Sequence, residues 1–133
     1  MDSRSPYDGT ARSLTIVLPP PKMPSANARS HWVVRMKAAR HDRYVAATLA
    51  MAEMRKCASW EPFRKAVVTV EWRGRGRLPD VDNIGGRTKA FIDGLTDAKA
   101  WSDDRLIQSI QFSTVRVKAL GDCGVLLTIT ETP

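Results

Sequence analysis

The 133-residue sequence contains no apolar run long enough to cross a bilayer, which takes about 20 consecutive apolar residues. Its N-terminus also lacks a cationic segment followed by an apolar stretch, which is the pattern of a secretory signal peptide. We therefore expect a protein without a membrane partner, located in the cytoplasm. It would be either a bacterial protein or a phage protein acting in the bacterial cytoplasm.

Cysteine is scarce, and this excludes two classes of small protein. Cys57 and Cys123 are the two cysteines, and they lie far apart in the chain. A disulfide framework or a structural zinc site would need more ligands at closer spacing. We therefore interpret both residues as buried free thiols. Ser102 has no histidine near it in the chain, so a serine-hydrolase triad is not supported either.

The charges are numerous and segregated. The formal net charge is +7, and residues 29–77 hold twelve Lys/Arg against four Asp/Glu. Residues 80–104 instead hold six Asp against three Lys/Arg. A basic excess alone often does no more than keep a surface soluble. A basic body around an acidic segment indicates more: a polyanion bound by the body and a cation held by the acids.

The apolar pattern predicts a single α+β domain. Alternating residues predict four strands, over about 14–18, 66–72, 106–118 and 123–130. Helices are expected over about 36–57 and 83–96. The order β-α-β-α-β-β predicts a mixed four-stranded sheet with two main helices. Residues 1–12 are polar and aperiodic, so we expect a disordered tail before one domain over residues 13–133.

The second helix has the clearest pattern. Its core-facing stripe repeats at i, i+4, i+7 and i+11, and comprises Ile84, Thr88, Phe91 and Leu95. A polar stripe of Asp82, Lys89 and Asp93 lies about 200° around the same helix. Two glycines near its start leave open a first turn as late as Arg87.

Two finer expectations concern the other elements. In the first helix, Val45, Leu49 and Ala52 should form the apolar stripe, with Tyr44 and Met51 beside it. In the third strand, a change in the parity of the apolar residues predicts a bulge near Ser113–Thr114.

The acidic segment carries the most chemical information. Asp80 and Asp82 project to the same side of an extended segment, and acids return at Asp93 and at Asp103–Asp104. Either aspartate of the first pair would be unremarkable alone, because aspartate is common in loops and helix caps. Repeated acids beside Lys89 favour a site that holds a hard divalent cation against a phosphodiester.

Arginine and tryptophan residues accompany this segment. Arg73, Arg75 and Arg77 alternate, so in an extended segment all three would line one side and lead towards the carboxylates. A charged strand edge has the same pattern, but the acidic neighbourhood favours phosphate contacts. Most tryptophans should serve in packing. Trp32 lies in a basic loop and is the best candidate to stack on a base.

Taken together, several motifs resemble the RusA family of Holliday-junction resolvases. The central ones are Asp-x-Asp-Asn, Lys-x-x-x-Asp-x-Leu and Asp-Asp, which occur in Leu78–Asn83, Lys89–Leu95 and Trp101–Asp104. The closing strand Val125–Glu131 is also similar to that family. So is the opening Leu18–Pro21 with Pro24, Ser25 and Asn27. The likeness covers most of the span from 14 to 131, and the central combination is specific.

The resemblance implies a small, dimeric, magnesium-dependent endonuclease that cuts four-way junctions symmetrically. Asp80 and Asp82 match the paired catalytic aspartates of the family, and Lys89 matches its catalytic lysine. Asp104 matches the third aspartate, with Asp103 as the alternative. The three aspartates would bind Mg²⁺, for which Mn²⁺ should substitute.

One feature departs from the family. The family lysine follows the second aspartate by four residues, whereas Lys89 follows Asp82 by seven. An insertion of three residues keeps the same helix face but moves the lysine about 4–5 Å along a regular helix. Either the glycines let the helix start rearrange, or Arg87 takes part of the lysine's role.

The sequence therefore predicts a Mg²⁺-dependent, structure-selective DNA endonuclease that resolves Holliday junctions by paired nicks, in recombination, repair or phage DNA processing. Two related cuts favour a C2 homodimer. Contacts with DNA are expected from Asn27, Arg29, Arg73, Arg75 and Arg77. Three alternatives remain: a non-catalytic junction or single-strand binder, a broader flap or fork nuclease, and an RNA-directed relative.

Overall fold

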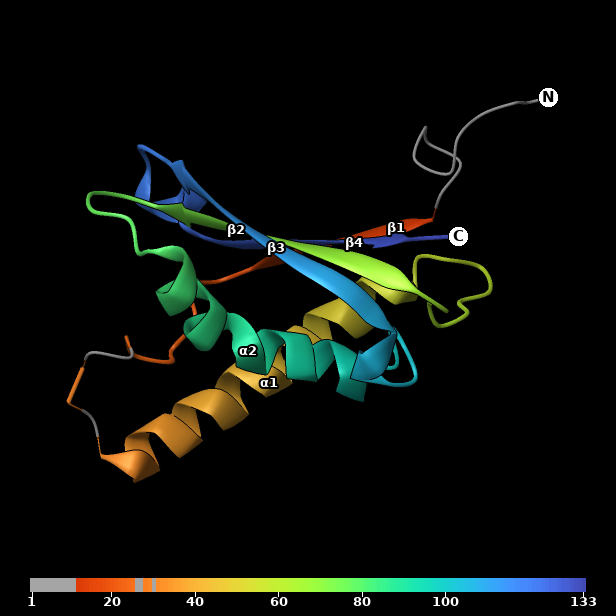
Figure 1. Cartoon of the computed structure of the whole chain (residues 1–133), viewed down its shortest axis with the longest axis horizontal. Coiled ribbons are helices and arrows are strands. Elements are labelled where there is room, and N and C mark those ends of the chain that lie inside the picture. The colour runs from red at the N-terminus through yellow and green to blue at the C-terminus, as the bar shows by residue number, and fades with distance from the viewer. Residues whose placement is uncertain (1–11, 26–27, 30) are drawn as a thin grey trace.

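The computed structural model describes residues 12–25, 28–29 and 31–133. The strands and helices follow the predicted order (Figure 1): β1 Ser13–Leu18, α1 Trp32–Met54, β2 Ala66–Gly74, α2 Val81–Asp97, β3 Ile107–Arg116 and β4 Gly124–Glu131. Short 3₁₀ turns, η1 Asp104–Leu106 and η2 Leu120–Asp122, precede the last two strands. The predicted α+β fold is confirmed. Except for Arg12, the tail expected over residues 1–12 lies outside the described residues.

The four strands form one mixed sheet in the order β1-β4-β2-β3. β4 pairs antiparallel with β1 and with β2, whereas β2 and β3 are parallel. β2 and β3 can be parallel because α2 lies between them in the chain. The helix returns the chain from the end of β2 to the side of the sheet where β2 begins, and β3 starts there. β1 and β3 are the two edges. As a result, the chain leaves β2 and enters α2 at the end of the sheet opposite to that where β3 begins.

The irregularity in β3 does not lie where the sequence predicts it. The register between β2 and β3 shifts between Ala66 and Val67, opposite Gln108, and is regular beyond that point. The expectation of a bulge near Ser113–Thr114 is therefore wrong. The apolar residues of β3 change parity at the end of the strand because β3 is an edge, where apolar side chains are not confined to one face.

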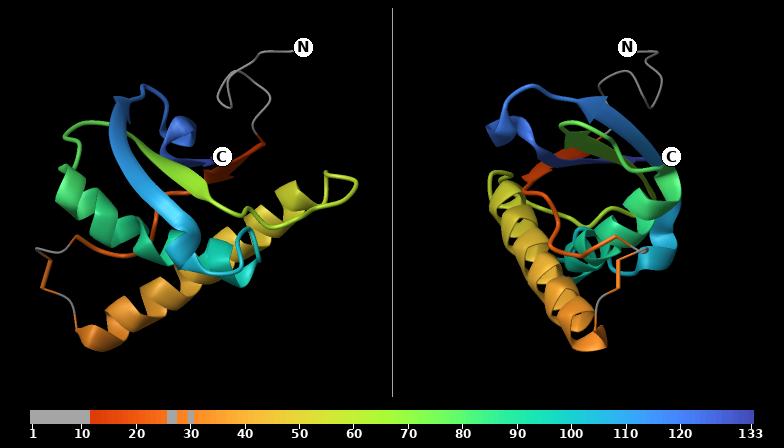
Figure 2. Two further views of the ribbon diagram at one scale, coloured as in Figure 1. Left: turned by 45° about the vertical axis from the view of Figure 1, so that its right-hand side comes forward. Right: turned by 90° about the vertical axis from the view of Figure 1, so that its left-hand side faces the viewer.

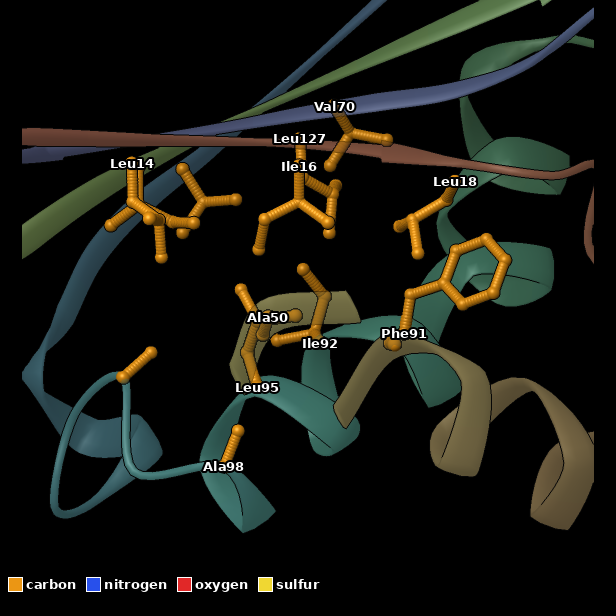
Figure 3. Close-up of a cluster of buried hydrophobic side chains, with 14 of the residues drawn as sticks. Leu14, Ile16, Leu18, Ala50, Val70, Phe91, Ile92, Leu95, Ala98 and Leu127 are labelled. Atoms are coloured by element: carbon orange, nitrogen blue, oxygen red, sulfur yellow. The ribbon is translucent and has the colours of Figure 1, made fainter. Parts of the chain in front are cut away.

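Both helices cover the same face of the sheet (Figures 1 and 2). Alternate strand residues point towards them, as Figure 3 shows for Leu14, Ile16, Leu18, Val70 and Leu127 above Ala50, Phe91, Ile92 and Leu95 of the helices. These side chains are buried, whereas β1 residues of the opposite parity are exposed. Burial of this one face supplies the main driving force for folding.

The buried stripe of α1 differs from the predicted one. It consists of Ala38, Asp42, Ala46, Ala50 and Met54. The predicted residues Tyr44, Met51 and Ala52 are exposed, and Val45 and Leu49 are only partly buried. Periodicity favoured the large apolar residues, but close packing of α1 on α2 requires small ones at the contact.

Asp42 in this stripe fixes the loop that precedes α1. Its carboxylate accepts hydrogen bonds from the backbone N–H groups of Lys22 and Met23, at 2.9 and 3.0 Å. Only 2% of Asp42 is exposed. The two bonds satisfy a buried carboxylate that would otherwise be costly. They hold the loop against α1.

None of the helices in the described parts of the chain has the length and apolar character of a bilayer span. Both cysteines are free thiols, but the expectation that they are buried is wrong. Cys57 is exposed and Cys123 is partly exposed. Each follows the end of an element, α1 and η2, and therefore lies outside the core.

Candidate functional site

The candidate site is organised by the start of α2. Asp80 is its N-cap, and the carboxylate accepts the backbone N–H of Asn83 at 2.8 Å. An aspartate cap stabilises the helix start and complements its dipole. The helix therefore begins at Val81 and includes Gly85–Gly86, so neither a rearranged start nor a start at Arg87 occurs.

The two faces of α2 are as predicted. Its apolar stripe is fully buried: Ile84, Thr88, Phe91 and Leu95. On the other face Asp82 and Lys89 are exposed and Asp93 is partly exposed. The Lys89 ammonium lies 3.3 Å from an Asp93 carboxylate oxygen. Because Asp82 and Asp93 are eleven residues apart on a regular helix, they are separated by about 16 Å along its axis.

Arg105 distinguishes the two neighbouring aspartates of the third motif. It donates to the Asp103 carboxylate through its backbone N–H, at 2.9 Å, and through its guanidinium, at 2.8 and 3.1 Å. These bonds lower the pKa of Asp103 to about 2. Asp104 is exposed and forms no ion pair with any described residue. The geometry therefore favours Asp104 over Asp103 as a ligand for an incoming cation.

Asp104 lies beside the middle of α2. It lines a pocket of about 290 Å³ between α2 and β3, together with Lys89 and Asp93. The remaining lining is mostly apolar, with two hydroxyl side chains among its residues: Gly85, Thr88, Ile92, Ile107, Ser109, Ile110 and Phe112. This pocket is thus lined by two carboxylates and an ammonium beside mainly apolar residues.

A second, larger cleft of about 680 Å³ lies at the start of α2. Asp80 lines it together with four arginines: Arg73, Arg75, Arg77 and Arg87. Three of these are the arginines expected to contact phosphates, so the structure brings them together with the first aspartate. They do not lie on one extended segment, because β2 ends at Gly74 and Gly76 turns the chain with a φ of +67°.

The arginines of this cleft differ in how firmly they are held. Arg73 forms an ion pair with Glu71 at 2.6 Å. Arg75 and Arg77 are exposed in the turn. Arg87 lies 4.7 Å from the centre of the Trp72 ring, and its Nε donates to the Met23 carbonyl oxygen at 3.0 Å. Desolvation by burial lowers the pKa of Arg87.

Sequence reasoning missed the separate role of Arg87. It predicted that Arg87 could take part of the role of Lys89, yet the two side chains line different cavities. The signal that could have located it is its spacing from Asp80, because residues seven positions apart lie on one helix face.

The loop before α1 is only partly described. Asn27 lies outside the described residues, and Arg29 is exposed without lining either cavity. Trp32 begins α1 and is 66% exposed, so its ring remains accessible for stacking. His31 serves as the N-cap of α1, where its Nδ1 accepts the backbone N–H of Val33 at 3.2 Å.

The predicted carboxylates do not share one cavity: Asp80 lines the larger cleft, Asp104 lines the smaller pocket, and Asp82 lines neither of the two. Among the described residues, no three His, Cys, Asp or Glu side chains are grouped closely enough to hold a metal ion. A single copy of the chain does not present Asp80, Asp82 and Asp104 as a ready three-carboxylate site. Mg²⁺ is nevertheless commonly held by one or two carboxylates together with phosphate oxygens and water, and the exposed Asp80 beside the arginines of the larger cleft fits that mode.

No protein-family model matches this chain, and no curated protein sequence matches it. The resemblance to the RusA family therefore depends on the motifs alone.

Proposed function

We propose that the protein is a Mg²⁺-dependent DNA endonuclease that acts on branched DNA, and in particular resolves four-way junctions. The observation that supports this most is the cleft in which Arg73, Arg75, Arg77 and Arg87 surround Asp80 at the N-terminus of α2. Guanidinium groups bind phosphate oxygens, often in pairs, and a helix N-terminus adds positive potential. A DNA backbone in this cleft brings a phosphate next to Asp80, a carboxylate that pure DNA binding would not require.

In this proposal Asp80, Asp82 and Asp104 are the ligands of Mg²⁺, with Mn²⁺ as a substitute. The bound cation would activate a water for attack on phosphorus and stabilise the charge that develops there. The arginines of the cleft position the DNA through its phosphates.

Lys89 and Arg87 have different tasks in this proposal. The Lys89 side chain is 76% exposed, and among the described residues its one ion pair is with Asp93. It can therefore turn towards a bound phosphate, where it stabilises negative charge in the transition state. Arg87 is fixed between Trp72 and Met23, so it acts as a rigid phosphate contact.

The motifs shared with the RusA family extend the proposal to a homodimer that makes two symmetric cuts, in a bacterial cytoplasm and in the service of recombination, repair or phage DNA processing. A symmetric four-way junction offers two equivalent phosphodiesters, which suits a two-fold enzyme.

A non-catalytic junction-binding protein is the second candidate. It is favoured by the separation of the carboxylates in a single copy and by the engagement of Asp80 as a helix cap. Such a protein would bind junctions through the same arginines, and its affinity would fall with salt but would not depend on divalent cations.

The test is cleavage of labelled four-way junction, flap, fork and linear duplex, each with Mg²⁺, with Mn²⁺ and with chelator. We expect paired, symmetric nicks in the junction that require the divalent cation. Equal cutting of flaps and forks would replace junction resolution with a broader branched-DNA activity. Tight, salt-sensitive binding without any cutting in either metal would overturn the enzyme proposal in favour of the junction binder.

A further inference from the structure

The buried stripe of α1 contains one charged residue, Asp42, between Ala38 and Ala46. Only 2% of Asp42 is exposed. Within the described ranges no lysine or arginine forms an ion pair with it, and its two oxygens instead accept the backbone N–H groups of Lys22 and Met23. Burying a charge costs free energy even when hydrogen bonds satisfy it. Packing alone therefore does not explain a carboxylate at a position whose neighbours in the stripe are alanines.

Met23 connects this carboxylate to Arg87, which lines the larger cleft. The N–H of Met23 donates to Asp42 at 3.0 Å, and its carbonyl oxygen accepts Arg87 Nε at 3.0 Å. The same guanidinium lies 4.7 Å from the centre of the Trp72 ring. Burial lowers the pKa of Arg87, and the negative charge of Asp42 opposes that shift. Asp42 thus acts on Arg87 in two ways, through the Met23 backbone and through its charge.

A second residue of α1 holds the same loop further along. Arg35 is seven positions before Asp42 and therefore lies on the same helix face. Its guanidinium donates to the carbonyl oxygens of Ser25 and Ala28, at 2.8 and 3.0 Å. The Ser25 hydroxyl donates to the side-chain oxygen of Asn83 at 3.3 Å, and Asn83 lines the larger cleft. α1 therefore fixes the loop at two places, and near each of them the loop contacts a residue of the cleft.

We propose that Asp42 is a positioning residue of the larger cleft: by fixing Met23, it fixes the guanidinium of Arg87 for contact with a DNA phosphate. Because the ligand is a DNA phosphate, this role rests on the proposed function. Arg87 uses its Nε for Met23, and its Nη1 and Nη2 atoms have no hydrogen-bond partner among the described residues. The N–H groups of these two atoms are left for phosphate oxygens, which a guanidinium binds in pairs. A side chain that is already fixed loses less conformational freedom on binding, so the contact is stronger.

Hydrogen exchange in the parent chain, measured by NMR without DNA, tests the coupling. After division by their intrinsic rates, Lys22 N–H, Met23 N–H and Arg87 Nε–H should exchange with the same opening free energy, because one opening of the loop exposes all three. The Arg87 signal is identified by its loss in Arg87→Ala. Unprotected Arg87 Nε–H beside protected Lys22 and Met23 N–H groups would overturn the proposal.

Two variants test the direction of this effect. Asp42→Asn has nearly the same shape, but its amide nitrogen cannot accept an N–H, so Met23 loses its fixed position. The exchange of Arg87 Nε–H should become about tenfold faster. Asp97→Asn is the matched control, since it removes a carboxylate that joins α2 to Arg43 of α1 at the surface, and it should leave the exchange of Arg87 unchanged. If Asp42→Asn does not fold, the exchange measured in the parent chain decides alone.

Junction binding supplies the functional readout, as a double-mutant cycle. Asp42→Asn should weaken affinity for a four-way junction about 5- to 10-fold in the parent chain, and should have little effect when Arg87→Ala is already present. Asp97→Asn should have little effect in either background. An equal loss with and without Arg87 would mean that Asp42 does not act through this residue, and would overturn the positioning role. Coupled exchange in a chain that does not bind the junction would instead refute the proposed function and leave the link between Asp42 and Arg87 in place.

Discussion

The guanidinium of Arg87 lies 4.7 Å from the centre of the Trp72 ring, which links α2 to β2 at the floor of the arginine cleft. The Met23 carbonyl holds the same side chain from the loop before α1. Lys89 is two residues further along the helix and lines the other cavity. Arg87 and Lys89 therefore do not lie in one site. Trp72 and Met23 hold the first cation, whereas the second is exposed beside Asp93.

This separation predicts different phenotypes for the two cations. Arg87→Ala should weaken junction binding and reduce the slope of log affinity against log salt by about one, because one phosphate contact is lost. Lys89→Ala should leave affinity nearly unchanged and slow nicking at saturating DNA. Binding titrations over a range of salt concentrations and single-turnover nicking measure the two effects. Arg87→Lys keeps the charge but not the planar stacking, so its affinity should be intermediate. An unchanged salt slope in Arg87→Ala would show that no phosphate contacts this residue.

The acidic residues predict a separation of binding from cutting. Asp82→Asn should abolish nicking and leave junction affinity intact, because it removes a ligand for the cation and no contact of the fold. Asp104→Asn should do the same. Asp103→Asn is the control, since it alters the neighbouring carboxylate that Arg105 already occupies. Gel-based nicking and binding assays on each variant measure both properties. Full cutting by Asp82→Asn would refute the assignment of the cation site.

The contact between α1 and α2 predicts a strong effect at one glycine. A Cβ at Gly94 would lie 2.9 Å from the Ala46 Cβ and closer still to the Arg43 carbonyl oxygen. Gly94→Ala should therefore lower the free energy of unfolding by about 2 kcal/mol through overpacking. In the same helix a Cβ at Gly86 would meet nothing within 4 Å. Gly86→Ala should raise stability by about 0.5–1 kcal/mol. Urea unfolding of both variants measures the difference, and equal effects would show that the helices are further apart than described.

Glu131 predicts a pH-dependent contribution to stability. Hydrogen bonds from Arg12, at 3.0 Å, lower the pKa of Glu131 below its ordinary value of 4.5. A carboxyl whose pKa is lowered by folding stabilises the protein above its ordinary pKa and ceases to do so as the pH falls through the folded value. Glu131→Gln should therefore lower the free energy of unfolding at neutral pH by about 1 kcal/mol, a small value because Arg12 is partly exposed. The deficit should shrink below about pH 4. A deficit that is the same in acid and at neutral pH would contradict the role of the ion pair.

Several features were predictable because they depend on local pattern. The buried stripe of α2 follows from its spacing, and the order of strands and helices follows from alternation and breakers. The buried stripe of α1 was not predictable in the same way. Its position depends on which residues let a second helix approach, and three of its five residues are alanines, whereas Tyr44 and Met51 are exposed.

Local sequence specifies the order of strands and helices, the exposed polar face of α2 and the closeness of acids and arginines along the chain, because these depend on residues within a few turns of one another. The grouping of these side chains in space depends on tertiary packing. A rise of about 1.5 Å per residue carries Lys89 and Asp93 away from Asp80, while the turn at Gly76 folds Arg75 and Arg77 back towards it. The edge position of β3 likewise depends on the order of strands in the sheet. No local pattern specifies that order, because every strand carries the same backbone N–H and C=O groups before it pairs with its neighbours.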